Sequence, residues 1–321
     1  MQMNCKNQKK INLRAIPTAL VVTLLTGIML MTVGPFISTA QAADQAIFNT
    51  ADLAVDALTR ALAQDDTEAL LNIFGKEYED ELLDDDRKSR ERAAQAIKEK
   101  TELWDEGADK KILYMGNEIW PLPFPLVKTK AGWYFDTEAG IEELVNRRIG
   151  RNELSAIEFC QLYIDAQIKY ASTDRDGDEV REYAQLIAST QGKKDGLYWE
   201  EVEGEELSPF GPLVADAKDY LIDREPGDPF KGYYYKVITR QGSDAIGGRY
   251  DYIINGNMIA GFALIAFPAE HGNTGIMTFT CSHQGKVYQK DFGEDSNLIA
   301  AGVDEYNPDS SWEEVKVQAG K

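Results

Sequence analysis

The sequence predicts an α+β fold: N-terminal helices with a small antiparallel sheet, then one long helix packed on an antiparallel meander. Three observations lead to this prediction. Apolar residues recur at helical spacing from about residue 51, a longer helical stripe lies in the middle of the chain, and the last third holds short β-rich runs separated by glycine-containing turns. Of the 321 residues, 43% are hydrophobic, so the chain can bury a sizeable core.

The charge balance argues against some classes of partner. The 54 acidic and 34 basic residues give a formal net charge of −20. Nucleic acids and anionic membrane surfaces are bound by clustered lysine and arginine, so neither is an expected partner. The two histidines leave little room for a metal site or a catalytic triad built on histidine.

The first 42 residues have the pattern of a signal peptide. Basic residues and no acidic ones precede an apolar stretch at 16–33, and the small residues Ala40 and Ala42 follow it. This pattern predicts cleavage between Ala42 and Ala43, and therefore a periplasmic or secreted protein with no transmembrane helix in its mature chain. A retained signal anchor is the alternative.

Residues 43–150 are expected to form the first α+β domain. Asn49 and Thr50 are suited to cap a helix, and Gly75 is suited to end a second one. Helices are expected at 51–62, 67–74, 87–104 and 138–148, and strands at 112–115 and 119–127. Pro121, Pro123 and Pro125 alternate in the last segment and remove donors from one edge only, which predicts an edge strand; a polyproline II segment is the alternative.

Residues 151–295 are expected to form the second domain, with residues 296–321 as a tail. The dipeptide Asn255-Gly256 favours a type I′ turn between two strands. Helices are expected at 153–171 and 182–189, and strands at 232–239, 250–254, 258–267, 276–282 and 287–290.

An acidic loop after the long helix is the best candidate for a metal site. Its carboxylates occur at alternate positions with a fourth further on, which supplies hard oxygen ligands at the spacing of a calcium loop. The match to an EF-hand is incomplete, because Glu179 and Gln185 stand where that loop requires glycine and glutamate. An ordinary acidic loop is the alternative. The candidate calcium ligands are Asp174, Asp176, Asp178 and Glu182.

Two further sets of residues are candidates for other roles. Cys160 on the long helix and Cys281 on a strand could meet and form a disulfide if the helix packs on the sheet; two buried thiols are the alternative. Glu270, His271 and Asn273 lie in a glycine-bounded loop between strands, where ligand-binding residues often occur. No nucleophile–base motif is present, and no catalytic residue is predicted.

Several strings of the sequence resemble the domain-of-unknown-function family 2950, whose members are exported bacterial proteins without an assigned activity. The resemblance covers nearly the whole mature chain. The strings are Trp120-Pro121-Leu122-Pro123, Gly132-Trp133-Tyr134-Phe135-Asp136, the segment 148–153, Gly232-Tyr233-Tyr234-Tyr235 and the segment 261–279.

The second half also resembles the globular domain of pseudopilins. The resemblance rests on Ala166, Gln167 and Tyr170, followed by Gly232-Tyr233 and the segment 262–268. It implies a helix-on-meander fold, but no retained apolar helix precedes the long helix, which argues against filament assembly. The first half is similar to small NTF2-like α+β folds.

These observations predict an exported acidic protein of unknown activity. We expect it to be a non-enzymatic binding or envelope-associated module rather than an enzyme. The expected partner is an envelope protein or a glycan. The alternative is a cell-envelope hydrolase whose Asp/Glu pair converges only in three dimensions, because paired carboxylates leave no sequence motif. No cofactor is expected other than calcium at the acidic loop.

Overall fold

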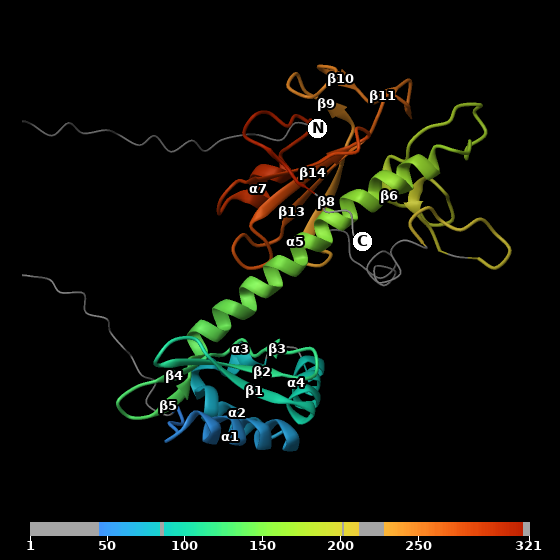
Figure 1. The fold of residues 1–321 in the computed structure, drawn as a ribbon. Helices are drawn as coiled ribbons and strands as arrows, with labels where there is room; N and C mark the ends of the chain where they lie inside the picture. Colours follow the sequence, from blue (N-terminus) through green and yellow to red (C-terminus); the bar gives the residue numbers. More distant parts are fainter. Residues whose placement is uncertain (1–44, 84–86, 201, 212–227, 317–321) are drawn as a thin grey trace, which may run out of the picture. The chain divides into compact units, whose positions relative to one another are not determined.

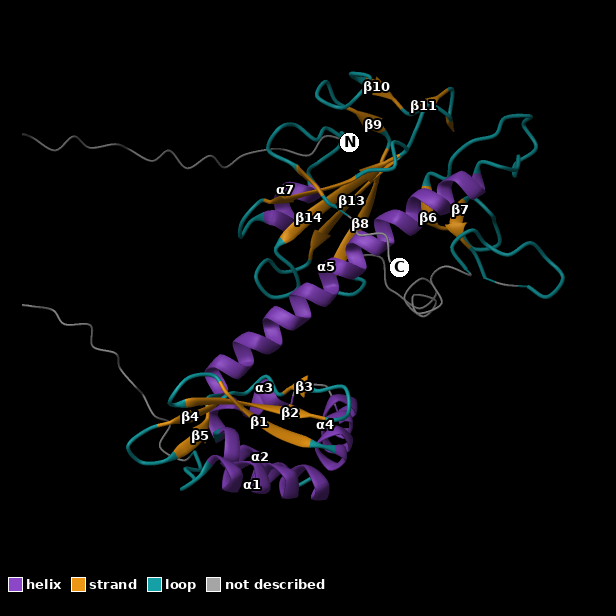
Figure 2. Ribbon diagram, in the orientation of Figure 1, coloured by secondary structure: helices purple, strands orange, loops and turns teal. Residues whose placement is uncertain are grey.

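The computed structural model describes residues 45–83, 87–200, 202–211 and 228–316 (Figure 1). It contains helices and mainly antiparallel sheets (Figure 2), which confirms the predicted α+β class. The predicted signal peptide and its cleavage site lie outside the described residues. None of the described helices combines the length and the apolar composition that a bilayer-spanning segment requires.

A first hydrophobic core, here called the N-terminal core, forms between helices and one face of a sheet. Two of its helices begin at side-chain caps: the Leu53 amide donates to Thr50 Oγ1 (3.2 Å), and the Ala69 amide donates to Asp66 Oδ1 (3.0 Å). The helical elements are α1 (Ala51–Gln64), α2 (Thr67–Phe74), η1 (Lys76–Tyr78), α3 (Glu79–Leu83) and α4 (Arg87–Glu99).

The sheet of the N-terminal core has the strand order β1-β2-β4-β5, with β3 paired to one end of β2. The predicted helix 87–104 is too long, because α4 ends at Glu99 and Trp104 lies in a strand that pairs in register with β2. Leu113, Leu126 and Phe135 point into the core and are fully buried. The strands are β1 (Thr101–Asp105), β2 (Lys110–Met115), β3 (Trp120–Pro121), β4 (Leu126–Lys128) and β5 (Trp133–Phe135).

The alternating prolines leave two short strands in place of the single edge strand that was predicted. β3 lies at an edge, where it pairs with β2 alone, and the Leu122 amide donates to the Leu113 carbonyl (2.7 Å). β4 lies inside the sheet between β2 and β5. The segment therefore turns inward after its first strand, and Leu122 and Phe124 become part of the core.

One helix, α5 (Thr137–Tyr170), contributes to two hydrophobic cores. It runs for 34 residues without interruption, so the two helices expected at 138–148 and 153–171 are one. The boundary expected between residues 150 and 151 falls inside this helix. Gly150 stands at this boundary. Glycine in a helix interior is less favourable than alanine by only about 1 kcal/mol, and the packing of the flanking turns offsets this loss.

The second core, here called the C-terminal core, lies between α5 and a five-stranded antiparallel sheet. α5 packs on β13, β14 and β15, and the buried Tyr163 hydroxyl donates to the Ala263 carbonyl (3.3 Å). The expected helix on a meander is confirmed. The strands, in sheet order, are β16 (Glu313–Glu314), β15 (Val287–Asp291), β14 (Met277–Ser282), β13 (Ala263–Pro268) and β8 (Tyr233–Ile238).

The helix expected at 182–189 is wrong. A side chain fixes this segment as extended backbone: the Ala184 amide donates to Gln167 Oε1, and Gln167 Nε2 donates to the Ala184 carbonyl (both 2.8 Å). The chain then forms β6 (Leu186–Ala188), which pairs in parallel with β7 (Gly196–Tyr198).

The structure also differs from expectation after residue 295, where a tail was predicted. Residues 296–316 contain α7 (Ser296–Ala301) and β16, and the side chain of Tyr306 is fully buried. Backbone pairing holds the segment, because the Tyr306 amide donates to the Arg240 carbonyl and its carbonyl accepts from the Gly242 amide (both 3.0 Å).

Four short strands complete the C-terminal part. Asn255 and Gly256 both have positive φ angles (54° and 98°) and join two of them, which confirms the expected turn. The strands are β9 (Arg240–Gln241), β10 (Tyr250–Asp251), β11 (Ile253–Ile254) and β12 (Asn257–Met258).

Candidate functional site

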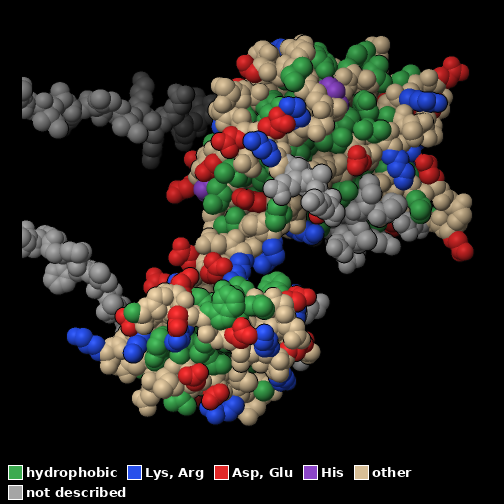
Figure 3. Space-filling model, viewed as in Figure 1, with side chains coloured by type: hydrophobic (Ala, Val, Ile, Leu, Met, Phe, Trp, Pro, Cys, Tyr) green, Lys and Arg blue, Asp and Glu red, His purple; other side chains and the backbone are tan. Residues whose placement is uncertain are grey.

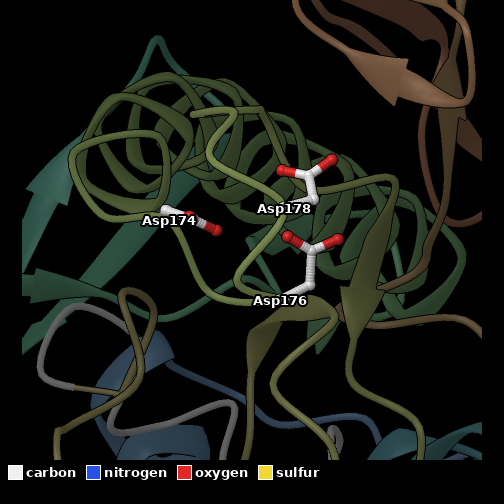
Figure 4. Close-up of side chains that lie close together, drawn as sticks. All are labelled: Asp174, Asp176 and Asp178. Carbon is white, nitrogen blue, oxygen red and sulfur yellow. The ribbon is translucent and has the colours of Figure 1, made fainter.

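The acidic loop beyond α5 brings three of its four candidate carboxylates together. One oxygen from each of Asp174, Asp176 and Asp178 lies within 4.8 Å of the others, and Figure 4 shows all three on the same loop. Asp174 accepts bonds from the Gly177 amide (2.8 Å) and the Glu179 amide (3.0 Å). These bonds, with that of Gly177 the larger cause, lower the pKa of Asp174 and keep its carboxylate charged.

Two contacts fix the far end of the loop. Asp178 Oδ1 accepts from the Val180 amide (2.8 Å), and its Oδ2 accepts from Asn257 Nδ2 (2.7 Å) at the start of β12. Three charged carboxylates at this separation repel one another, and a bound divalent cation would relieve that repulsion while using oxygen ligands of the kind Ca²⁺ prefers.

Glu182, the fourth candidate ligand, lies outside this group of aspartates. Its Oε2 accepts a hydrogen bond from the Met258 amide (3.1 Å). Burial raises the pKa of Glu182, which opposes the charged form that a metal ligand needs. The structure therefore gives this residue a partner on β12 and leaves the three aspartates as the candidate ligands.

Arg175 holds the start of the loop against the end of α5. Its Nη1 donates to the carbonyls of Tyr170 and Thr173, and its Nη2 donates to Glu206 Oε1 (2.8 Å). The guanidinium also stacks over the rings of Tyr170 (4.5 Å) and Trp199 (5.7 Å). Sequence reasoning missed this residue, although a basic side chain near the C-terminal end of a helix can bond its last carbonyls.

The loop between β13 and β14 separates its three candidate ligand residues into two groups. Asn273 Nδ2 donates to Glu270 Oε2 (2.5 Å), whereas His271 Nε2 pairs with Asp291 Oδ1 (2.9 Å) on β15. Asp291 also accepts from the Gly293 amide, which is the larger cause of its lowered pKa. Glu270 and His271 therefore have different partners.

The same loop is fastened to α5 through three side chains. Arg148 Nε donates to the Asn273 carbonyl (3.1 Å), and Asn152 Nδ2 donates to the Thr274 carbonyl (2.9 Å). Glu153 Oε1 accepts from the amides of residues 276 and 277 (2.9 and 3.0 Å). Two of the strings that carry the family resemblance, 148–153 and 261–279, thus meet at one place, and these polar residues hold the backbone of the loop.

The packing of α5 on β14 places Cys160 and Cys281 next to each other. Cys160 on α5 and Cys281 on β14 are both fully buried free thiols, and Cys281 Sγ lies 3.6 Å from the Cys160 carbonyl oxygen.

The face of the first sheet that points away from the helices is lined by aromatic and aliphatic side chains, and it is here called the aromatic face. The strand register places Trp104, Ile112, Tyr114, Val127 and Tyr134 on it. The Trp104 and Tyr114 rings are 4.4 Å apart, and Trp104 is 48% exposed. Figure 3 shows hydrophobic side chains at the surface over this part of the molecule.

The aromatic residues of this sheet differ in their exposure to solvent. Trp133 and Phe135 do lie in the N-terminal core, but Trp104 and Trp120 are exposed. Each exposed indole N–H donates to the glutamate two positions before it, Glu102 or Glu118, at 3.0 Å. The sequence feature that could have indicated these exposed, bonded tryptophans is the repeated spacing Glu-x-Trp.

A cavity of about 280 Å³ lies between α1 and α2. Asp66 is the acidic side chain in its described lining, and that carboxylate caps α2. The geometry of this cavity therefore does not supply the pair of carboxylates that the hydrolase alternative requires.

Comparison with known proteins gives a family and no function. Searches of curated proteins and of solved structures gave no match to the chain, so the resemblance to pseudopilins stays a prediction. The model of the family described as "Protein of unknown function (DUF2950)" matches residues 45–315, which include both hydrophobic cores. The chain therefore belongs to this family of uncharacterised proteins.

Proposed function

We propose that the mature chain acts outside the cytosol as a non-enzymatic binding module, and that its ligand is a neutral glycan of the cell envelope. The observation that carries this proposal is the exposed Trp104 ring, which packs at a tilt on Tyr114 at the β1 edge of the aromatic face. The signal-peptide pattern of residues 1–42 supports the location.

The chemistry of the aromatic face suits a sugar ring. The Trp104 indole N–H is already bonded to Glu102, which fixes the ring and leaves its apolar face free to cover the C–H face of a pyranose. The ion pair between Lys100 and Glu102 (2.7 Å) borders the ring with groups that can bond sugar hydroxyls. The net charge of −20 favours an uncharged ligand over an anionic one.

Calorimetric titration of the mature protein with a chitin oligosaccharide, a neutral glycan, tests the proposal. Trp104→Ala removes the stacking surface and should weaken binding about tenfold or more, because an aromatic side chain that becomes covered contributes about 1.5–3 kcal/mol. Trp120→Ala is the matched control: the side chain is also exposed and bonded to a preceding glutamate, but its register partner Met115 places it off the aromatic face.

The outcomes separate binding from catalysis. Absence of binding by the wild type, or equal weakening by both variants, contradicts the proposal. Release of reducing ends from the oligosaccharide would favour the hydrolase alternative instead.

Calcium binding at the acidic loop is a second candidate function, supported by the proximity of Asp174, Asp176 and Asp178. Calcium at millimolar concentration should raise the melting temperature, and a chelator should reverse the rise. Asp176→Asn removes one charge from the group and should abolish the calcium-dependent shift. An unchanged melting temperature of the wild type in calcium contradicts this candidate.

A further inference from the structure

We propose that Cys160 and Cys281 are joined by a disulfide bond that links α5 to the central strand β14, and that this bond forms while the chain folds. The inference is independent of the proposed glycan ligand. It depends on the contact between one residue of α5 and one residue of β14, and on the complete burial of both side chains.

The two residues come from elements that pack directly on each other. Cys281 lies on β14, where it pairs with Leu264 on one side and Val287 on the other, so the strand cannot shift without breaking both pairings. Its Sγ is 3.6 Å from the Cys160 carbonyl oxygen, which is a contact with the helix backbone at the residue that carries the second sulfur. The Cys160 thiol is close enough to help raise the pKa of the Cys281 thiol. The two cysteines therefore lie next to each other where α5 packs on β14.

The surroundings decide when the bond can form. Both side chains have no exposed surface, and the buried ring of Tyr163 packs beside them in the same core. Burial, and next the neighbouring Cys160 thiol, raise the pKa of Cys281, so the folded protein holds little of the thiolate that exchange requires. An oxidant can reach these sulfurs only before α5 covers the sheet, and a reductant cannot reach them afterwards.

The reaction balances with a disulfide as oxidant, and oxidised glutathione is the form used here. One cysteine thiolate attacks a sulfur of oxidised glutathione, which forms a mixed disulfide and releases one glutathione thiolate. The second cysteine thiolate attacks the cysteine sulfur of that mixed disulfide and releases the second glutathione. The two cysteines lose two protons and two electrons, and one oxidised glutathione becomes two reduced molecules.

Peptide mapping of the protein from an oxidising compartment tests the bond itself. The protein is denatured without reductant, its free thiols are alkylated, and trypsin is added. Cleavage after Arg151, Lys169, Arg249 and Lys286 releases residues 152–169 and 250–286, which each hold one of the two cysteines and no other. We expect these peptides as one linked species that separates on reduction, whatever the state of Cys5. Two separately alkylated peptides in the unreduced sample, or a linkage between two chains, would overturn the proposal.

A second experiment tests the timing with the reduced protein. Oxidised glutathione added to the folded, reduced protein should leave both thiols free, whereas refolding from denaturant with oxidised glutathione should give the linked peptide. The linked form should melt about 10 °C or more above the reduced form, because the bond closes a loop of more than 100 residues. Rapid oxidation of the folded protein would overturn the timing, and refolding that leaves both thiols free would overturn the bond.

Discussion

Replacing Gly140 by alanine tests how tightly the start of α5 packs in the N-terminal core. A Cβ atom at this position would lie 1.9 Å from Phe124 Cδ1 and 2.6 Å from Phe124 Cε1. The Phe124 ring is itself buried and packs against Phe74, with ring centroids 4.6 Å apart. The ring therefore cannot turn away from the new methyl group without disturbing a second buried ring.

The expected change in the free energy of unfolding has two parts. Alanine is about 0.8–1.0 kcal/mol more favourable than glycine in a helix interior. Overpacking of a filled core is unfavourable by about 1–3 kcal/mol, and a contact this short belongs at the upper end of that range. The net expectation for Gly140→Ala is a destabilisation of about 2 kcal/mol.

Urea unfolding followed by circular dichroism measures this change as a lower midpoint of the transition. Gly150→Ala in the same helix is the matched control, because a Cβ there meets nothing within 4 Å. This control should raise the stability by about 1 kcal/mol from helix propensity alone. If Gly140→Ala is as stable as the wild type, or if the two variants shift the midpoint in the same direction, the packing argument is refuted.

Two further variants probe the contacts that hold the segment after α5. Arg175→Ala should lower the stability by about 1–3 kcal/mol in urea unfolding, because it removes the side-chain donor to the carbonyls of Tyr170 and Thr173 together with the bond to Glu206. The exposed Arg181→Ala should change the stability by less than about 0.5 kcal/mol. Gln167→Ala should lower the stability by about 2–4 kcal/mol, because it leaves the buried amide and carbonyl of Ala184 unpaired. A loss below about 1 kcal/mol for Gln167→Ala would show that solvent reaches this backbone.

The parts of the fold that the sequence predicts correctly are specified by local patterns. The β13–β15 meander follows from short apolar runs between turns, and the Asn255-Gly256 turn requires only that two adjacent residues adopt positive φ. The caps of the first helices are local for the same reason. Three of the four candidate calcium ligands also meet because they alternate along one short loop.

The parts that sequence reasoning missed depend on partners far away in the chain. The segment at Ala184 is extended because Gln167 pairs with its backbone, and Tyr306 is buried because the chain returns to Arg240. Glu182 lies apart from the three aspartates because it accepts a hydrogen bond from the Met258 amide on β12. Trp104 fits a helical pattern but lies in a strand, since pairing with β2 decides its conformation. A local pattern carries no information about such contacts.

The unbroken course of α5 affects how this protein can be divided for study. A fragment that stops at residue 150 would end in mid-helix, and its last four carbonyls would lose the amides that follow them. The complementary fragment would lack Arg148 and with it one fastening of the β13–β14 loop. Proteolytic or genetic dissection should therefore leave residues 137–170 in a single piece, and limited proteolysis should cut the native protein before or after this segment rather than within it.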